Sequence, residues 1–137
     1  MLRIDTHTHI LPREMPKWSE RFGGGSYIHL EHGSRKGFAR MMQGNQFFRE
    51  IGENCWDEKV RKKEYAEQST QVQVVCTIPV MFNYDAPLAH AEEIAQFLND
   101  HISNLVANDP LHYAGLATVP MQDTDSAIRE LERAQAN

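Results

Sequence analysis

Short segments rich in β-branched residues alternate with segments of helical periodicity, and this alternation limits the possible folds more than any other feature of the sequence. Three strands are predicted, at residues 2–6, 71–78 and 113–119. The second and third run directly into Pro79 and Pro120, and a proline cannot donate a ladder hydrogen bond. Strands separated by helices indicate parallel pairing through right-handed crossovers.

Helices are predicted between and after these strands. Residues 88–106 have one apolar stripe, because apolar side chains recur there at helical steps: Leu88, Ala91, Ala95, Leu98, Ile102 and Leu105. Residues 57–67 form a charged helix with Asp57 as its N-cap. A last helix starts at Asp123 or Asp125. Its buried side is expected to carry Ala127, Ile128, Leu131 and Ala134.

Residues 13–56 have no clear period. Glycines interrupt this stretch repeatedly, and Gly23-Gly24-Gly25-Ser26 indicates a loop. A long aperiodic segment in a compact domain is usually functional, so we interpret the stretch as a functional insertion. The predicted order is strand, insertion, helix, strand, helix, strand, helix, within one domain of residues 1–137.

Two α/β architectures share this order of elements: an open doubly wound sheet and a closed (β/α)₈ barrel. Periodicity favours neither of them. The first strand is not followed by a G-x-G-x-x-G turn, which weakens a dinucleotide-binding interpretation.

Composition excludes some partners. The formal net charge is −5 and the chain has no long basic block, so nucleic acid is not expected to bind. The N-terminus lacks the apolar run of a signal peptide, and no stretch has the ~20 apolar residues of a membrane span. Cys55 and Cys76 have no metal-type spacing and are expected to be small buried side chains, reduced in the cytoplasm.

The most informative motif is His7-Thr8-His9, at the end of the first predicted strand. Residues i and i+2 of a strand face the same side, so both imidazoles can reach one metal ion. Neutral imidazole suits Zn²⁺. With seven histidines in 137 residues one such pair can arise by chance, so its position at a strand end carries the weight. The alternative is a pair of surface or hydrogen-bonded histidines.

The remaining histidines are weaker candidates. His29 and His32 are three residues apart and would meet on a helical turn, but they lie in glycine-rich sequence. His90, His101 and His112 are expected to be solvent-facing or structural.

The segment Arg3–Pro12 resembles the opening of the amidohydrolase superfamily, in particular its decarboxylase branch. Further blocks in the same order resemble that branch: Phe48-Arg49, Glu53–Asp57, Thr77–Phe82 and Thr118–Asp123. The resemblance implies a distorted (β/α)₈ barrel, of which this chain supplies about the first three βα units. It also implies zinc-dependent, non-oxidative decarboxylation of a small dicarboxylate in tryptophan degradation by the kynurenine route.

The resemblance also assigns roles to residues. His7 and His9 map onto two ligands of one divalent metal, expected to be Zn²⁺, and Arg49 maps onto an arginine that binds a substrate carboxylate. A guanidinium fork suits this role because it holds a carboxylate through two parallel hydrogen bonds. By composition alone, Arg49 would be a solvated surface cation. A homodimer is possible, again by resemblance.

The sequence departs from the family pattern in two respects. Tyr65-Ala66 and Ser69 replace a usual Met-Asp pair and a glycine. These positions are expected on a helix and in the turn after it, away from the metal ligands. The chain ends at Asn137, whereas the family's other metal ligands and its acid-base histidine come later, so no catalytic residue is assigned within this chain. Alternatives are a related metal-dependent hydrolase, a hydroxybenzoate decarboxylase, or a non-catalytic truncated fragment.

Overall fold

The computed structural model describes residues 1–136 of the chain. These residues form two compact units, which are described separately. The first unit consists of Met1–Leu11 together with the chain from Tyr65 onwards, and the second consists of Pro12–Glu64.

The first unit contains a parallel sheet of three strands in the order β1-β5-β6. The strands are β1 (Ile4–His9), β5 (Val72–Cys76) and β6 (Tyr113–Gly115). The predicted parallel pairing is therefore confirmed. β1 extends through both histidines of the His-x-His motif, further than residues 2–6.

The third strand is shorter than predicted, because a side chain takes the place of a strand partner. After Gly115, the Leu116 N–H still donates a sheet hydrogen bond to the Val75 carbonyl, at 2.9 Å. The Thr118 N–H then donates to Oδ1 of Asn99 at 2.8 Å, and the Thr118 carbonyl accepts from Nδ2 of Asn99 at 2.8 Å. Both backbone groups of Thr118 are satisfied by one amide, so this stretch leaves the sheet.

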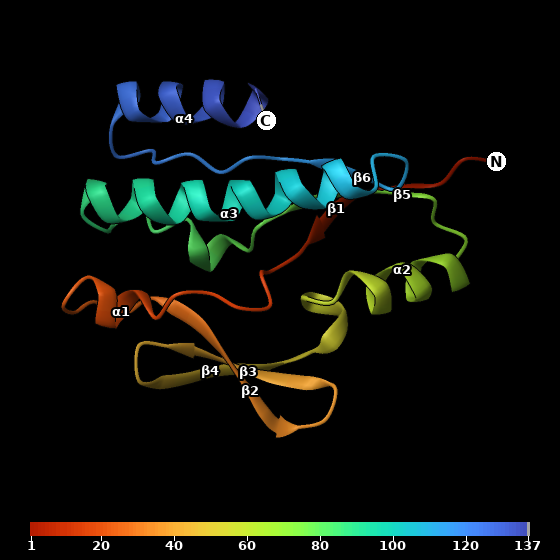
Figure 1. The fold of residues 1–137 in the computed structure, drawn as a ribbon, viewed down its shortest axis with the longest axis horizontal. Helices are drawn as coiled ribbons and strands as arrows, with labels where there is room; N and C mark the ends of the chain where they lie inside the picture. Colours follow the sequence, from red (N-terminus) through yellow and green to blue (C-terminus); the bar gives the residue numbers. More distant parts are fainter. Residues whose placement is uncertain (137) are drawn as a thin grey trace. The chain divides into compact units, whose positions relative to one another are not determined.

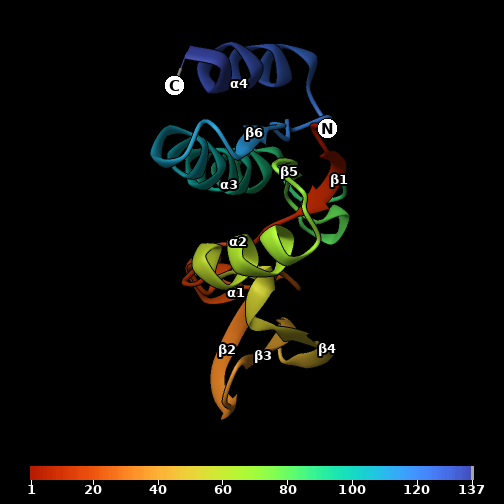
Figure 2. The same cartoon turned by 90° about the vertical axis from the view of Figure 1, so that its right-hand side faces the viewer.

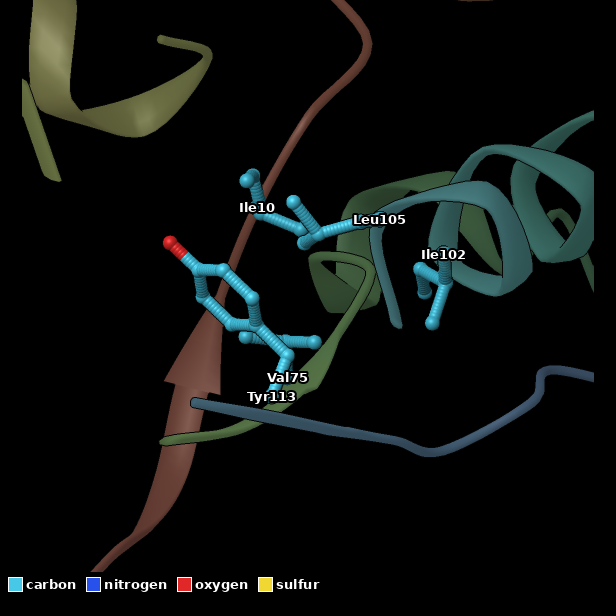
Figure 3. Close-up of a cluster of buried hydrophobic side chains, with 5 residues drawn as sticks. All are labelled: Ile10, Val75, Ile102, Leu105 and Tyr113. Carbon is cyan, nitrogen blue, oxygen red and sulfur yellow. The ribbon is translucent and has the colours of Figure 1, made fainter. Parts of the chain in front are cut away.

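Helix α3 (Leu88–Asn108) packs against the parallel sheet and matches the prediction closely (Figures 1 and 2). Its stripe contributes to a buried cluster that also takes side chains from the ends of β1 and β5 (Figure 3). The members are Ile10, Val75, Ile102, Leu105 and Tyr113. Each fully buried aliphatic side chain stabilises the fold by roughly 1.5–3 kcal/mol. Since Ile10 follows His9 directly, this cluster anchors the end of β1.

Helix α4 (Thr124–Ala136) begins at the predicted N-cap Asp123, whose Oδ1 accepts the N–H of Ser126 at 2.9 Å. Its predicted buried face is wrong, since Ile128 and Leu131 are 50% and 46% exposed. Ala127 and Ala134 are half-buried. The buried side chains are instead Ser126 and Glu130.

A polar network explains this orientation of α4. Glu130 accepts hydrogen bonds from Asn99 on α3 at 2.6 Å and from Arg133 at 2.7 Å. Arg133 also bonds Asp100 at 2.6 Å, and these acidic partners raise its pKa. The network turns the polar side of α4 toward α3, so the apolar stripe of α4 faces outward.

Helix α2 (Glu58–Glu67) has the predicted cap, because Oδ1 of Asp57 accepts the N–H groups of Lys59 and Val60 at 2.9 and 3.1 Å. At its other end, the Ser69 N–H bonds the Ala66 carbonyl and the Thr70 N–H bonds the Tyr65 carbonyl, both at 3.0 Å. This is the Schellman pattern, with Ser69 at the position that favours glycine. The φ of Ser69 is 58°, in the left-handed region.

The second unit contains regular strands, which the aperiodic sequence of residues 13–56 does not predict. Its three strands form an antiparallel meander (Figures 1 and 2): β2 (Ile28–Arg35), β3 (Phe38–Gln43) and β4 (Gln46–Gly52). Both hairpins have two-residue turns, and Gly37 and Gly44 take φ values of 77° and 57° there. Such turns need positive φ, which explains the glycines that seemed to mark a loop. Short helices flank the meander, α1 (Trp18–Arg21) and η1 (Glu53–Cys55).

The two cysteines have free thiols and are half-buried, so the expectation of fully buried side chains holds only in part. Burial raises the pKa of both thiols. Within residues 1–136, none of the helices has the length and apolar character required to cross a membrane.

Candidate metal centre

The strand that carries the His-x-His motif has a local irregularity. Along β1 the pairing advances from Asp5 to Thr8, while along β5 it advances only from Gln73 to Val75. The extra residue of β1 is a bulge, which changes the faces on which neighbouring side chains lie. Thr8 is consequently buried beside Val75, and His9 pairs with Cys76 on the other, less buried face.

The structure brings His7 and His9 together, as the i, i+2 spacing predicts. Their ring centroids are 4.9 Å apart and the ring planes are nearly perpendicular, at 89°. His7 is exposed and His9 is half-buried. Between them, the Thr8 hydroxyl bonds the Val74 carbonyl at 3.1 Å and fastens β1 to β5.

The orientation of His9 is fixed by the backbone that follows β5. Its Nδ1 lies 2.9 Å from the carbonyl oxygen of Thr77. A carbonyl only accepts, so Nδ1 carries the proton and the neutral ring has its lone pair on Nε2. The Sγ of Cys76 lies 3.3 Å from the same Nδ1. A metal-binding histidine typically has its second nitrogen bonded in this way.

Sequence reasoning missed the Thr77 contact because a main-chain carbonyl has no residue signature. The chain just after it forms the turn η2 (Pro79–Met81), and Thr77 itself is buried.

The donor set suits a divalent metal but is incomplete. Two neutral imidazoles on one face are appropriate Zn²⁺ ligands, and a catalytic zinc takes three protein ligands. Among residues 1–136, His, Cys, Asp and Glu side chains nowhere gather in threes around a position for a metal ion. His7 and His9 therefore fit part of a site.

Tyr65 contacts the strand that carries the motif, through Asp5. Its hydroxyl donates to Oδ2 of Asp5 at 3.2 Å. The other carboxylate oxygen, Oδ1, accepts the backbone N–H of His7 at 3.2 Å. A residue that departs from the family pattern thus contacts the backbone of the motif through one carboxylate.

Arg49 lies in the second unit, on the edge strand β4, and its side chain is exposed. It faces Met41 of β3 in the register, and its guanidinium carbon is 5.8 Å from the centre of the exposed Phe48 ring. Within the described residues Arg49 has no ion-pair partner, which leaves its donors available to a ligand.

The other histidines have different surroundings. His29 and His32 lie on β2, where residues three apart face opposite sides, so they do not meet as they would on a helical turn. His32 bonds the Arg13 carbonyl at 2.7 Å. Burial lowers the pKa of the half-buried His101 on α3, and His112, in the turn after that helix, bonds Asp109 at 2.7 Å. Structural roles for His101 and His112 agree with the prediction.

Solved structures of low sequence identity share the fold. The dihydroxybenzoic acid decarboxylase of Polaromonas, solved with bound manganese, superposes with a TM-score of 0.67 at 19% identity, covering 99% of this chain and 35% of that one. The 5-carboxyvanillate decarboxylase of Sphingomonas paucimobilis gives 0.65 at 18% identity, covering 98% and 39%. No protein-family model matches the sequence. These likenesses show that the chain shares its fold with the two decarboxylases.

Curated relatives are more similar to this chain in sequence than these solved structures are. The 2-amino-3-carboxymuconate-6-semialdehyde decarboxylase of Dictyostelium discoideum is 47% identical over 133 residues, which are 96% of this chain and 36% of the relative. The protein of the same name from Caenorhabditis elegans is 33% identical, over 92% of this chain and 31% of the relative. The chain is a homologue of these decarboxylases and spans about a third of their length. The resemblance found in the sequence is thereby confirmed.

Proposed function

We propose that this chain is part of a metal-dependent decarboxylase that acts on 2-amino-3-carboxymuconate-6-semialdehyde. The central observation is the pair His7 and His9, with His9 held in the tautomer that suits a metal ligand. The similarity to curated decarboxylases of this name over 96% of the chain supports the choice of substrate. A role in tryptophan degradation by the kynurenine route belongs to the same proposal.

In this proposal His7 and His9 are two ligands of one divalent metal. The Thr77 carbonyl holds the proton on Nδ1 of His9, so Nε2 is the ligand atom. Such a metal, when bound, supplies Lewis acidity at the site. We propose Zn²⁺, since neutral imidazoles suit it, while one related structure holds manganese.

Arg49 is proposed to bind a carboxylate of the substrate. Decarboxylation breaks the bond to one carboxylate and puts a proton in its place, so the substrate must be held with that bond correctly oriented. The planar guanidinium offers two parallel donors to a carboxylate. Its exposed position on β4 leaves this fork accessible.

The chain is further proposed to supply about the first three βα units of a distorted (β/α)₈ barrel. Its parallel order β1-β5-β6 and the helices between the strands support this arrangement. Large apolar side chains of the first unit lie exposed, among them Leu116 and Leu131, as expected for surfaces that further units cover. The remaining metal ligands and the acid-base residue would come from those units.

A hydroxybenzoate decarboxylase is the alternative. The gamma-resorcylate decarboxylase of Polaromonas is 44% identical, but over only 35% of this chain. We favour the semialdehyde because two curated decarboxylases of that name match nearly the whole chain. The protein is proposed to work in the cytoplasm, as a homodimer, on a small dicarboxylate.

The direct test is an activity assay on the complete protein that contains this chain, reconstituted with Zn²⁺. The semialdehyde and 2,6-dihydroxybenzoate would be supplied separately, and CO₂ release would be measured. Release from the semialdehyde alone, abolished by a chelator and restored by Zn²⁺, is the expected result. Release only from 2,6-dihydroxybenzoate would favour the alternative, and release from neither would contradict the proposal.

A further inference from the structure

One carboxylate connects Tyr65 to the backbone of the first proposed metal ligand. Oδ2 of Asp5 accepts the Tyr65 hydroxyl, and Oδ1 of Asp5 accepts the backbone N–H of His7, both at 3.2 Å. All three residues belong to the first unit. The contacts therefore form within one compact body.

This connection lies at the bulge of β1. Between Asp5 and Thr8, β1 has one residue more than the facing part of β5. A bulge disrupts the regular ladder, so the backbone there requires other hydrogen-bond partners to hold one conformation. The Asp5 carboxylate supplies such a partner to His7, and the Tyr65 hydroxyl keeps that carboxylate in place.

The backbone of Tyr65 is held by hydrogen bonds. Its carbonyl accepts the N–H groups of Gln68 and Thr70, at 3.1 and 3.0 Å, in the closing turn of α2. The backbone of Tyr65 is thus ordered by the closing turn of the helix.

We propose that Tyr65 is a positioning residue for His7, acting through Asp5. Its hydroxyl holds the bulge in the conformation that keeps the His7 ring beside the His9 ring, at the present centroid separation of 4.9 Å. This inference rests on the metal site proposed above. Tyr65 itself contacts neither the metal nor the substrate.

The test compares Co²⁺ binding by the complete protein and two matched variants. Tyr65→Phe removes only the hydroxyl, and Tyr84→Phe removes the hydroxyl of an exposed tyrosine in the same unit. The d–d absorption of Co²⁺ reports both affinity and ligand geometry. Tyr65→Phe should weaken binding by about tenfold, because outer partners of metal ligands are typically worth roughly 10- to 100-fold in affinity. Tyr84→Phe should bind as the wild type does.

A second measurement needs no metal. Amide exchange at His7 should speed up in Tyr65→Phe, since its Asp5 partner becomes less ordered, and remain unchanged in Tyr84→Phe. Merely structural damage would accelerate exchange throughout the first unit. Local acceleration together with weaker Co²⁺ binding supports the inference.

The outcomes separate this inference from the proposed function. Unchanged Co²⁺ affinity in Tyr65→Phe, with wild-type binding that His7→Ala removes, would overturn the positioning role and leave the metal site standing. Wild-type binding that His7→Ala does not reduce would refute the metal site, and the positioning role with it. If Tyr65→Phe does not fold, Asp5→Asn replaces it, and Co²⁺ affinity equal to the wild type in that variant would overturn the inference.

Discussion

The side-chain amide of Asn99 bonds both backbone groups of Thr118, with its Oδ1 2.8 Å from the N–H nitrogen and its Nδ2 2.8 Å from the carbonyl oxygen. Both residues are buried, and Nδ2 also donates to Glu130 at 2.6 Å. One side chain thus ties the segment after β6 and helix α4 to helix α3.

Asn99→Ala should lower the free energy of unfolding by about 3 kcal/mol. The substitution leaves the Thr118 groups and the Glu130 carboxylate buried without their partner, and each such loss costs roughly 1–3 kcal/mol. Denaturant unfolding measures the effect. Asn104→Ala, at an exposed position on the same helix, is the matched control and should change stability by less than about 0.5 kcal/mol. Equal effects of the two substitutions would contradict the role of Asn99.

Ser69→Gly should stabilise the protein by about 1 kcal/mol. Ser69 has a φ of 58° at the end of α2, and a left-handed conformation costs an L-residue roughly 1–2 kcal/mol, which the greater chain entropy of glycine partly offsets. Thermal unfolding measures the change. Ser34→Gly, at an exposed serine of β2 without positive φ, should instead destabilise. A melting temperature lowered by Ser69→Gly would show that the serine is not strained.

Much of the first unit follows from the sequence, because its elements are specified locally. The parallel pairing of the strands, the long helix α3 and the caps Asp57 and Asp123 were all predictable from period and capping residues. The buried face of α4 was not predictable, since the orientation of this helix depends on the contact between Glu130 and Asn99 on another helix. Helical periodicity alone favours burial of Ile128 and Leu131, which the tertiary contact overrides.

The strands of the second unit were not predicted, although the sequence carries a local signal for them. The two-residue turns Lys36-Gly37 and Gly44-Asn45 join these strands, and such turns are typical of hairpins. Within the site, the spacing of His7 and His9 predicted their common face correctly. The Thr77 carbonyl and the pair Asp5 and Tyr65 were not predictable, because only the folded chain brings them to the histidines.

Arg49→Ala should reduce kcat/KM by about two decades in the complete protein while changing stability little. A charge-assisted hydrogen bond is worth roughly 1.5–3 kcal/mol, and about 1.4 kcal/mol corresponds to a factor of ten. Arg35→Ala is the control, since Arg35 is also exposed in the meander but is paired with Glu50 at 2.7 Å. A large fall in melting temperature with unchanged kcat/KM would mean that Arg49 is structural.

The 137-residue chain by itself should neither catalyse decarboxylation nor behave as a well-packed monomer. Three parallel strands do not close a barrel, and their sheet edges stay unpaired. A cavity of about 430 Å³ opens between α3, residues 115–117 and α4, and it is lined by apolar side chains including Val106 and Leu131. Sedimentation and amide exchange measure association and packing. A monomeric, protected and active 137-residue chain would contradict the barrel proposal.

The assignment of His7 and His9 as metal ligands is the central claim, and metal analysis of the complete protein tests it most directly. The measurement is zinc bound per chain in the wild type, in His7→Ala/His9→Ala, and in His29→Ala/His32→Ala as a control from the other unit. We predict that the first double variant loses most of its zinc and nearly all decarboxylation, whereas the control retains both. Full zinc content in His7→Ala/His9→Ala would contradict the account.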